Sequence, residues 1–363
     1  MVTMIRQITY KYRIYPSDEQ IIQLAKTFGC CRFVFNHYLD SSKDNNYKSK
    51  VSNNNNCNRE LKIEYSFLNE VDKFALTNSI KTLDNAFKRF FSKLGNYPKF
   101  KSKRHIQSYQ TNYTNNNIEV LEKGIKQPKL GKVKAKVHRE IEGRIINATV
   151  KKYSSGKYYV CILVEKEIHL KEEEDSVIGL DMGLTNFITD NKGNKVSDPK
   201  ALSSLEKKLS IEQRKLSLKK KGSNNYDKQR IQVARVHERI ENIRNNFLEQ
   251  LSTKIVNENQ VIVVEDLSIK KMMEERNLSK RLSDVSIATF IKKLEYKSKW
   301  YGRVFIKVGK YYPSSQVCSC CGNKNPLVKD LSIRAWECPI CHTEHDRDIN
   351  AAINILEEGI FNY

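Results

Sequence analysis

The sequence predicts a mixed α+β protein with several domains, and three observations indicate this class. Alternating apolar and polar residues, which are typical of half-buried strands, mark the start of the chain and the stretch from Ile118 to Glu165. Apolar residues spaced three and four apart predict long helices before and after that stretch. Five of the nine cysteines fall within 24 residues, which is typical of a metal-binding module. At 363 residues, the chain is long enough for two or three domains.

The charge balance indicates a polyanionic partner. Lys and Arg number 64 against 42 Asp and Glu, a formal net charge of +22, and a hydrophobic content of 39% excludes a wholly disordered polycation. No basic amphipathic helix with an aromatic face stands out, so nucleic acid is favoured over an anionic membrane. The longest apolar run, Tyr158–Val164, is far shorter than the roughly 20 residues that span a bilayer, and the first residues resemble no secretory signal. We therefore expect a soluble, cytoplasmic protein without a membrane partner.

The N-terminal third is predicted to be one strand followed by helices. Ile8–Ile14 alternates as a strand does, and Ser17 begins a capping box that opens a helix extending to about Tyr38. The polar run Asn53–Asn56 is expected to be a loop, after which helical spacing resumes over about Arg59–Phe91.

A basic and aromatic stretch follows that helix. Lys88–Arg104 holds seven Lys and Arg residues and no acid, interleaved with Phe90, Phe91, Tyr97 and Phe100. Such a composition suits a nucleic-acid groove, because the cations bind phosphate and the rings stack on bases. The alternative is a helix end whose aromatic residues are core and whose lysines are solvated.

Strands are expected from Ile118 to Glu165. Lys132, Lys134, Lys136 and His138 alternate with apolar residues, which places a basic row on one face of a strand. Asn147–Tyr153 and Lys157–Val164 flank a short hairpin loop. We expect the strand at 8–14 to complete this sheet or barrel, with the helices of 17–110 inserted.

A second unit is predicted after a charged linker, Glu165–Asp175. Two long helices joined by a turn at Lys219–Asn225 are read as a helical hairpin, with coiled-coil dimerisation as the alternative. The other expected elements are a strand at Val177–Asp181, a strand hairpin at 186–196, a strand at Val261–Val264, a helix from about Ser283 to Trp300, a strand at Val304–Val308 and a last helix at Asn350–Glu357.

The clustered cysteines have the spacing of a zinc ribbon. Two CxxC pairs separated by sixteen residues supply the four expected ligands, Cys318, Cys321, Cys338 and Cys341. Four thiolates leave no open position for water, so this zinc is expected to be structural. Cys320 would leave one residue between ligands, and replacement of a cysteine by His342 or His345 is the less favoured alternative.

Three acids are candidates for a second metal site. Asp181 and Glu265 each end an apolar strand, and Asp348 lies at the start of the last helix. An acid at the end of a buried strand is costly unless it is paired or binds a cation. Converging carboxylates could hold two Mg²⁺ ions about 3.5–4 Å apart for phosphodiester hydrolysis. The alternative is that each acid caps a helix or pairs with a lysine.

Motifs along the chain resemble those of the TnpB family, insertion-sequence proteins that are related to type V CRISPR effectors. Ile178–Gly183, Val263–Leu267 and Asp346–Ile355 resemble its three RuvC motifs, and the cysteines lie between the second and third, as in that family. Further similar stretches, in the family's order, are Thr27–Val34, Tyr97–Lys101, Pro128–Gly131, Ser283–Ser286, Leu294–Lys297 and Tyr312–Ser315.

The resemblance implies a fold and a catalytic site. It implies a nuclease of RNase H-like (RuvC) fold in which Asp181, Glu265 and Asp348, rather than Asp346, bind two catalytic Mg²⁺ ions. The implied domains are a wedge β-barrel at 1–25 and 115–170, a helical recognition lobe at 26–110, a RuvC part at 175–310 with the helical hairpin at 200–252, a zinc ribbon at 311–344 and a final RuvC part at 345–363.

The resemblance also implies partners. A guide RNA from the transposon right end would direct the protein to double-stranded target DNA beside a transposon-adjacent motif, with one protein per RNA in a prokaryotic host. The alternatives are a guided repressor that does not cut, a compact type V CRISPR effector, a strand-joining transposase and a zinc-ribbon DNA-binding factor.

Overall fold

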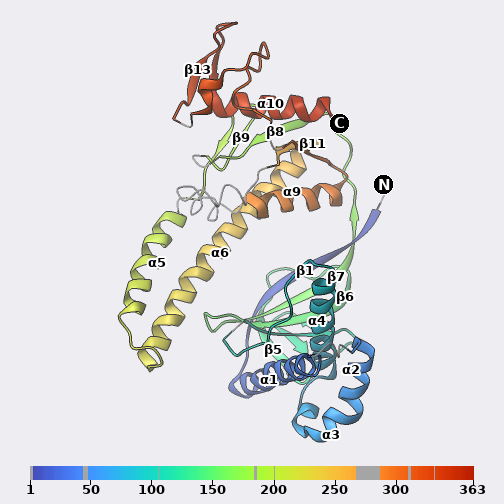
Figure 1. Cartoon of the computed structure of the whole chain (residues 1–363). Coiled ribbons are helices and arrows are strands. Elements are labelled where there is room, and N and C mark those ends of the chain that lie inside the picture. The colour runs from blue at the N-terminus through green and yellow to red at the C-terminus, as the bar shows by residue number, and fades with distance from the viewer. Residues whose placement is uncertain are drawn as a thin grey trace. The chain divides into compact units, whose positions relative to one another are not determined.

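The chain forms two compact units. The computed structural model describes residues 3–43, 48–104, 106–183, 186–199, 201–266, 287–309, 312–330 and 332–363. We call Ile5–Glu167 the N-terminal unit, and Ile168–Tyr363 with the first residues of the chain the C-terminal unit (Figure 1). Each unit has its own hydrophobic core. Among the described residues, no helix combines the length and apolar character needed to cross a membrane.

A seven-stranded sheet is the framework of the N-terminal unit, with the order β2-β6-β7-β1-β5-β4-β3. The first strand lies between β7 and β5, as expected, and the predicted hairpin is β6 and β7. On β5, Val133 and Ala135 are buried while the alternating Lys132, Lys134 and Lys136 are exposed, which confirms the predicted basic row on this strand. The strands are β1 Thr3–Tyr15, β2 Gln107–Asn112, β3 Glu119–Leu121, β4 Gly124–Gln127, β5 Gly131–Lys136, β6 Arg144–Lys152 and β7 Tyr158–His169.

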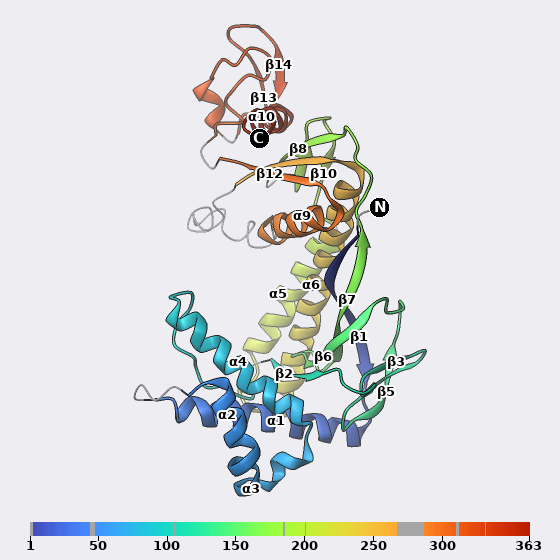
Figure 2. The same ribbon diagram turned by 90° about the vertical axis from the view of Figure 1, so that its right-hand side faces the viewer.

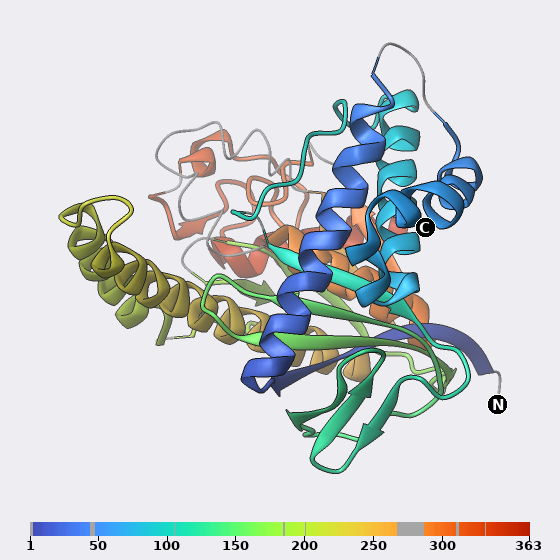
Figure 3. The same ribbon diagram turned by 90° about the horizontal axis from the view of Figure 1, so that it is seen from below.

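The helices of this unit are inserted between β1 and β2. The two longest, α1 and α4, pack on each other and against β2, and Figure 3 shows the blue α1 crossing the sheet. The predicted capping box is present, because the Ser17 hydroxyl accepts the Gln20 amide and the Gln20 side chain accepts the Ser17 amide. The helical segments are α1 Asp18–Asp40, α2 Lys50–Asn56, the π-helical turn η1 Cys57–Leu61, α3 Lys62–Glu64, the 3₁₀ turn η2 Ser66–Glu70 and α4 Lys73–Phe91.

Two expectations for these helices were wrong. The asparagine run is not a loop but lies in α2, because tertiary contacts outweigh the weak helix propensity of Asn. Asn53 is buried and donates to the Lys48 carbonyl, and Asn56 accepts the Tyr38 hydroxyl. The helix expected over 59–91 is interrupted at Tyr65, whose ring packs 4.8 Å from that of Phe33.

A five-stranded sheet organises the C-terminal unit, with the order β10-β9-β8-β11-β12. The three strands β8, β11 and β12 run parallel, and β9 and β10 form the predicted antiparallel hairpin. The seventh strand of the other sheet extends to His169, so the segment predicted as a linker begins as a strand. The strands are β8 Val177–Asp181, β9 Ile188–Asp190, β10 Lys195–Val196, β11 Val261–Glu265 and β12 Val304–Val308.

Helices cover both faces of this sheet, which makes three layers (Figure 1). Ile262 and Val264 pack on one face with residues of α6 (Asn224–Glu258) and α9 (Ile287–Tyr301). On the other face, Val263 packs against α10 (Arg347–Phe361). The close approach of α10 to β8 requires Gly179, because a Cβ there would lie 2.3 Å from the Ala352 carbonyl oxygen. The predicted start of α9 at Ser283 lies outside the described residues.

The two long helices pair within the chain, as predicted. The fifth helix, α5 (Ala201–Ser217), packs on α6 through Leu202, Leu205, Val236 and Ile240. The hairpin therefore buries these four apolar residues within one chain.

A small module of two short strands follows β12 and rests on α10 (Figure 2). Its elements are the 3₁₀ turn η3 Pro326–Lys329, β13 Ala335–Glu337 and β14 Glu344–Asp346. The last helix begins at Arg347, three residues before the predicted start, because the Asp346 carboxylate caps its first turn.

Candidate metal centres

Two of the candidate acids lie side by side at the carboxyl ends of parallel strands. Leu180 of β8 pairs with Val264 of β11, so Asp181 and Glu265 are the next residues along each strand. Neighbouring strands lie about 4.7–4.9 Å apart, and matched positions of a parallel pair project toward the same face. The sheet therefore places both carboxylates at one edge.

The third acid comes from the helix above this edge. Asp348 is in the first turn of α10, and α10 packs on β8. Burial, followed by the charges of Asp348 and Glu265, raises the pKa of Asp181 to about 7. Burial, followed by the charge of Asp266, raises the pKa of Glu265 to about 7. Partly buried carboxylates that repel one another are a favourable environment for a cation.

The acids are not drawn into a tight cluster. Among the described residues, the groups of metal-binding side chains whose ligand atoms all lie within 4.8 Å of one another consist of cysteine and histidine, so the ligand atoms of the three acids do not all lie within that distance. This spacing is compatible with a site for two ions about 3.5–4 Å apart, because such a site has ligands on both of its sides.

The structure distinguishes Asp348 from Asp346. Asp346 accepts hydrogen bonds from the amides of Asp348 and Ile349, and its other carboxylate oxygen lies 2.6 Å from the Lys195 ammonium. Although partial burial would raise its pKa, these donors lower it. Both oxygens of Asp346 are therefore occupied by the helix cap and by Lys195. Asp348 Oδ1 lies 3.4 Å from Arg334 Nη1, and the Asp348 side chain is 18% exposed.

Two arginines near the acids were not singled out from the sequence. The Arg334 guanidinium, from the module before α10, contacts Asp348, and the charge of Arg347 lowers the pKa of Asp181. Arg347 lies inside the third motif, between the two acids, which is the one signal that pointed to it.

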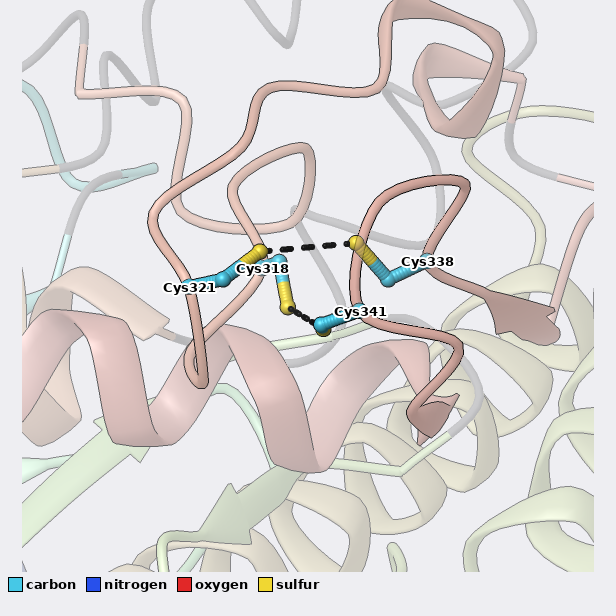
Figure 4. Close-up of side chains that lie close together, drawn as sticks. All are labelled: Cys318, Cys321, Cys338 and Cys341. Carbon is cyan, nitrogen blue, oxygen red and sulfur yellow. Dashed lines mark hydrogen bonds between the residues drawn. The ribbon is translucent and has the colours of Figure 1, made fainter.

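The four predicted cysteine ligands converge, as Figure 4 shows. Their sulfur atoms all lie within 4.8 Å of one another, and the pairs Cys318–Cys341 and Cys321–Cys338 are each 3.6 Å apart. Zinc–sulfur bonds of about 2.3 Å in a tetrahedron separate the sulfurs by about 3.8 Å. The donor set and its spacing therefore fit a tetrahedral zinc ion.

The backbone around the cysteines is built as two equivalent turns. The amide of Gly322 donates to the Cys318 carbonyl, and the amide of His342 donates to the Cys338 carbonyl. Both Gly322 and His342 have a positive φ, 73° and 54°. His342 Nδ1 lies 2.8 Å from a Glu337 carboxylate oxygen, outside the clustered ligand atoms, whereas His345 Nε2 lies 3.1 Å from Cys318 Sγ.

Most side chains of the basic and aromatic stretch Lys88–Arg104, which begins in the last turn of α4, are exposed. Phe91, Tyr97 and Phe100 are 58%, 41% and 49% exposed and Phe90 is partly exposed, so the alternative that the four rings are core was wrong. Part of the stretch lines a cavity of about 470 Å³, in which Lys99, Phe100 and Lys101 face residues of α1, α4 and β2.

Comparison with known proteins assigns the chain to a family. It is 33% identical, over 98% of its length and 91% of the other chain, to a protein of Streptomyces pristinaespiralis named "Putative RNA-guided DNA endonuclease". The chain belongs to the TnpB family. The InsQ protein of Escherichia coli, of the same description, is 29% identical over 98% of this chain and 93% of its own.

Family models match parts of the chain, and a solved structure shares its fold. Residues 159–276 match the OrfB family of IS605 elements, described as "Probable transposase", residues 288–355 match a Cas12f1-like TNB domain, and residues 4–50 match a helix-turn-helix domain. The fold of this chain is similar to that of a chain in the structure titled "Cryo-EM structure of the Cas12f1-sgRNA-target DNA complex", with a TM-score of 0.60 and 14% identity over 97% of this chain and 98% of that one.

Proposed function

We propose that this chain is an RNA-guided, Mg²⁺-dependent DNA endonuclease of an insertion sequence. The observation that carries the proposal is the placement of Asp181 and Glu265 at neighbouring strand ends, with Asp348 on the helix that covers them. The names of two relatives that match over nearly the full chain support the same activity.

Asp181, Glu265 and Asp348 would hold two Mg²⁺ ions, which when bound supply an activated water and neutralise the leaving oxygen of the phosphodiester. The carboxylates act as ligands and form no covalent bond to DNA. Because the pKa of Asp181 is about 7 without a cation, cation binding releases a proton from this acid near neutral pH. The charge of Arg347 favours the ionised form that binds the cation.

The four cysteines would bind one zinc ion that folds the module without taking part in the chemistry. We propose the family's domain plan for this chain: wedge barrel at 1–25 and 115–170, recognition lobe at 26–110, RuvC nuclease at 175–310 and 345–363, and zinc ribbon at 311–344. The three-layer arrangement of the C-terminal unit supports the RuvC part of this plan.

The partners would be a guide RNA from the transposon right end and double-stranded DNA beside a transposon-adjacent motif. The +22 charge fits proteins that hold guide and target by their phosphates while base pairing reads the sequence. The exposed lysines of β5 and the exposed stretch Lys88–Arg104 are candidate contacts in the N-terminal unit.

A compact CRISPR effector is the second candidate, because the fold is similar to that of Cas12f1. The retained acids argue against a guided repressor that does not cut. A zinc-ribbon DNA-binding factor would leave the three acids without a role.

The deciding experiment is plasmid cleavage by the protein purified with its element's right-end RNA. The plasmid carries a guide-matched target beside a randomised motif, and reactions contain Mg²⁺ or EDTA. We expect guide-dependent, EDTA-sensitive double-strand cuts that Asp181→Ala abolishes and that the exposed-linker control Asp175→Ala retains. Guided DNA binding without cutting would favour the repressor, and cutting by Asp181→Ala would refute the proposed site.

A further inference from the structure

A second group of metal-binding side chains lies beside the four cysteines. Cys318, Cys320 and His345 each offer one ligand atom, and these atoms all lie within 4.8 Å of one another. Neither Cys320 nor His345 is needed by the four-cysteine site, so these two residues have no assigned role.

The position of His345 is fixed by its surroundings. It is 8% exposed on β14, paired across the hairpin with Trp336, whose ring centroid lies 4.8 Å from its own. This packing aims Nε2 at Cys318 Sγ, 3.1 Å away. For bonds of about 2.3 Å to sulfur and about 2.0 Å to nitrogen, a 3.1 Å separation corresponds to a ligand–metal–ligand angle near 90°.

The donors define the chemical class of the ligand. Two thiolates and one imidazole nitrogen suit a thiophilic cation such as Zn²⁺, Cd²⁺ or Cu(I), and they do not suit Mg²⁺ or Ca²⁺. Cys318 would be shared, since a thiolate has lone pairs for two ions. Cys318 is buried and Cys320 is exposed, so the second site opens to solvent on the Cys320 side and a water can complete its coordination.

We propose that the ribbon binds a second thiophilic cation through Cys320, His345 and the bridging thiolate of Cys318. The competing arrangement is a single-ion ribbon in which His345 Nε2–H donates a hydrogen bond to the Cys318 thiolate. The two arrangements differ in stoichiometry and in their dependence on Cys320, because a hydrogen bond from His345 to Cys318 does not involve Cys320.

Cadmium titration of the full-length reduced protein separates them. The metal-free chain is titrated with Cd²⁺ against a competing chelator, while bound metal is counted by mass spectrometry and thiolate-to-cadmium charge transfer is followed by absorbance. We expect two ions per chain in the native protein, and one ion in Cys320→Ser and in His345→Gln. The control Cys161→Ser, a cysteine of β7 outside the ribbon, should keep two.

Retention of one ion in Cys320→Ser and His345→Gln shows that the four-cysteine site, and hence the ribbon, is still folded. A native stoichiometry of one at saturation would overturn the proposal and leave His345 as a hydrogen-bond donor. A second ion that persists in both variants would also overturn it, because that ion would be bound elsewhere. Neither result depends on whether the protein cuts DNA.

Discussion

Replacement of Asp181 by Asn should stabilise the metal-free protein while it removes cutting. The wild-type carboxylate is partly buried near two other acids, and its pKa is raised from 3.8 to about 7. The unfolded chain therefore loses this proton at lower pH than the folded chain. The protonated Asp181 side chain stabilises the folded state fully below about pH 4, and this stabilisation is lost as pH rises through about 7. Asn keeps the size of the side chain and an oxygen that can accept the Met182 amide.

The size of the effect follows from the pKa shift. About three pKa units correspond to an upper limit of about 4 kcal/mol above pH 7. Relaxation of the site and penetration by water reduce this, and we expect about 1–3 kcal/mol. In a unit of about 200 residues, 1 kcal/mol shifts the Tm by about 2–4 °C, so Asp181→Asn should raise the Tm by about 2–12 °C at pH 8.

Thermal unfolding of the RNA-free protein in EDTA, between pH 4 and pH 8.5, measures this difference. The Tm difference between Asp181→Asn and the wild type should shrink as pH falls below 7. The control Asp175→Asn removes the same charge from an exposed linker position and should have the Tm of the wild type. Added Mg²⁺ should raise the Tm of the wild type and leave that of Asp181→Asn nearly unchanged. If the Tm of Asp181→Asn at pH 8 were equal to or below that of the wild type, burial and repulsion by the other acids would not destabilise the Asp181 carboxylate, and the argument would be refuted.

Three other changes test the architecture. Cys338→Ser should lower zinc content and soluble yield, and an unchanged zinc stoichiometry would remove the ribbon assignment. Gly179→Ala should destabilise the C-terminal unit by about 1–3 kcal/mol or more in denaturant unfolding, because its Cβ would lie 2.3 Å from the Ala352 carbonyl oxygen. An unfolding midpoint equal to that of the wild type would contradict the close approach of α10 to β8. Asn354→Ala removes hydrogen bonds to the carbonyls of Ser314 and Val317, both 2.7 Å, and should speed hydrogen exchange in the ribbon, whereas native exchange there would show that the contact is dispensable.

Features governed by local pattern could be predicted from the sequence. The CxxC spacing predicted the cysteine cluster, since two tight turns and one hairpin are enough to form it. The strand ends at Asp181 and Glu265 were predicted from short apolar runs that end in an acid. Their convergence on one site was expected only from the resemblance to the TnpB family, because the order β10-β9-β8-β11-β12 depends on pairing between strands far apart in the chain.

The predictions that were wrong concern features that depend on contacts with other parts of the chain. Asn53 and Asn56 have weak helix propensity, and tertiary contacts offset it, because Asn53 is buried and the Tyr38 hydroxyl of α1 donates to Asn56. Local pattern also could not show that Phe91 and Phe100 stay exposed, because exposure depends on what the rest of the unit leaves uncovered. Asp348 was favoured over Asp346 by resemblance alone, and the structure adds a physical reason in the cap that Asp346 forms.

The last helix links the two candidate metal centres. Asp348 lies in its first turn, and Asn350, one half-turn later and 1% exposed, donates to the Val317 carbonyl and accepts the Ser319 amide. These two backbone groups flank Cys318, so the helix that presents the third acid is hydrogen-bonded to the first cysteine turn. Loss of the ion from the cysteines would loosen that turn and, through Asn350, the position of Asp348. Zinc removal should therefore weaken Mg²⁺ binding at the acids even though no cysteine touches them.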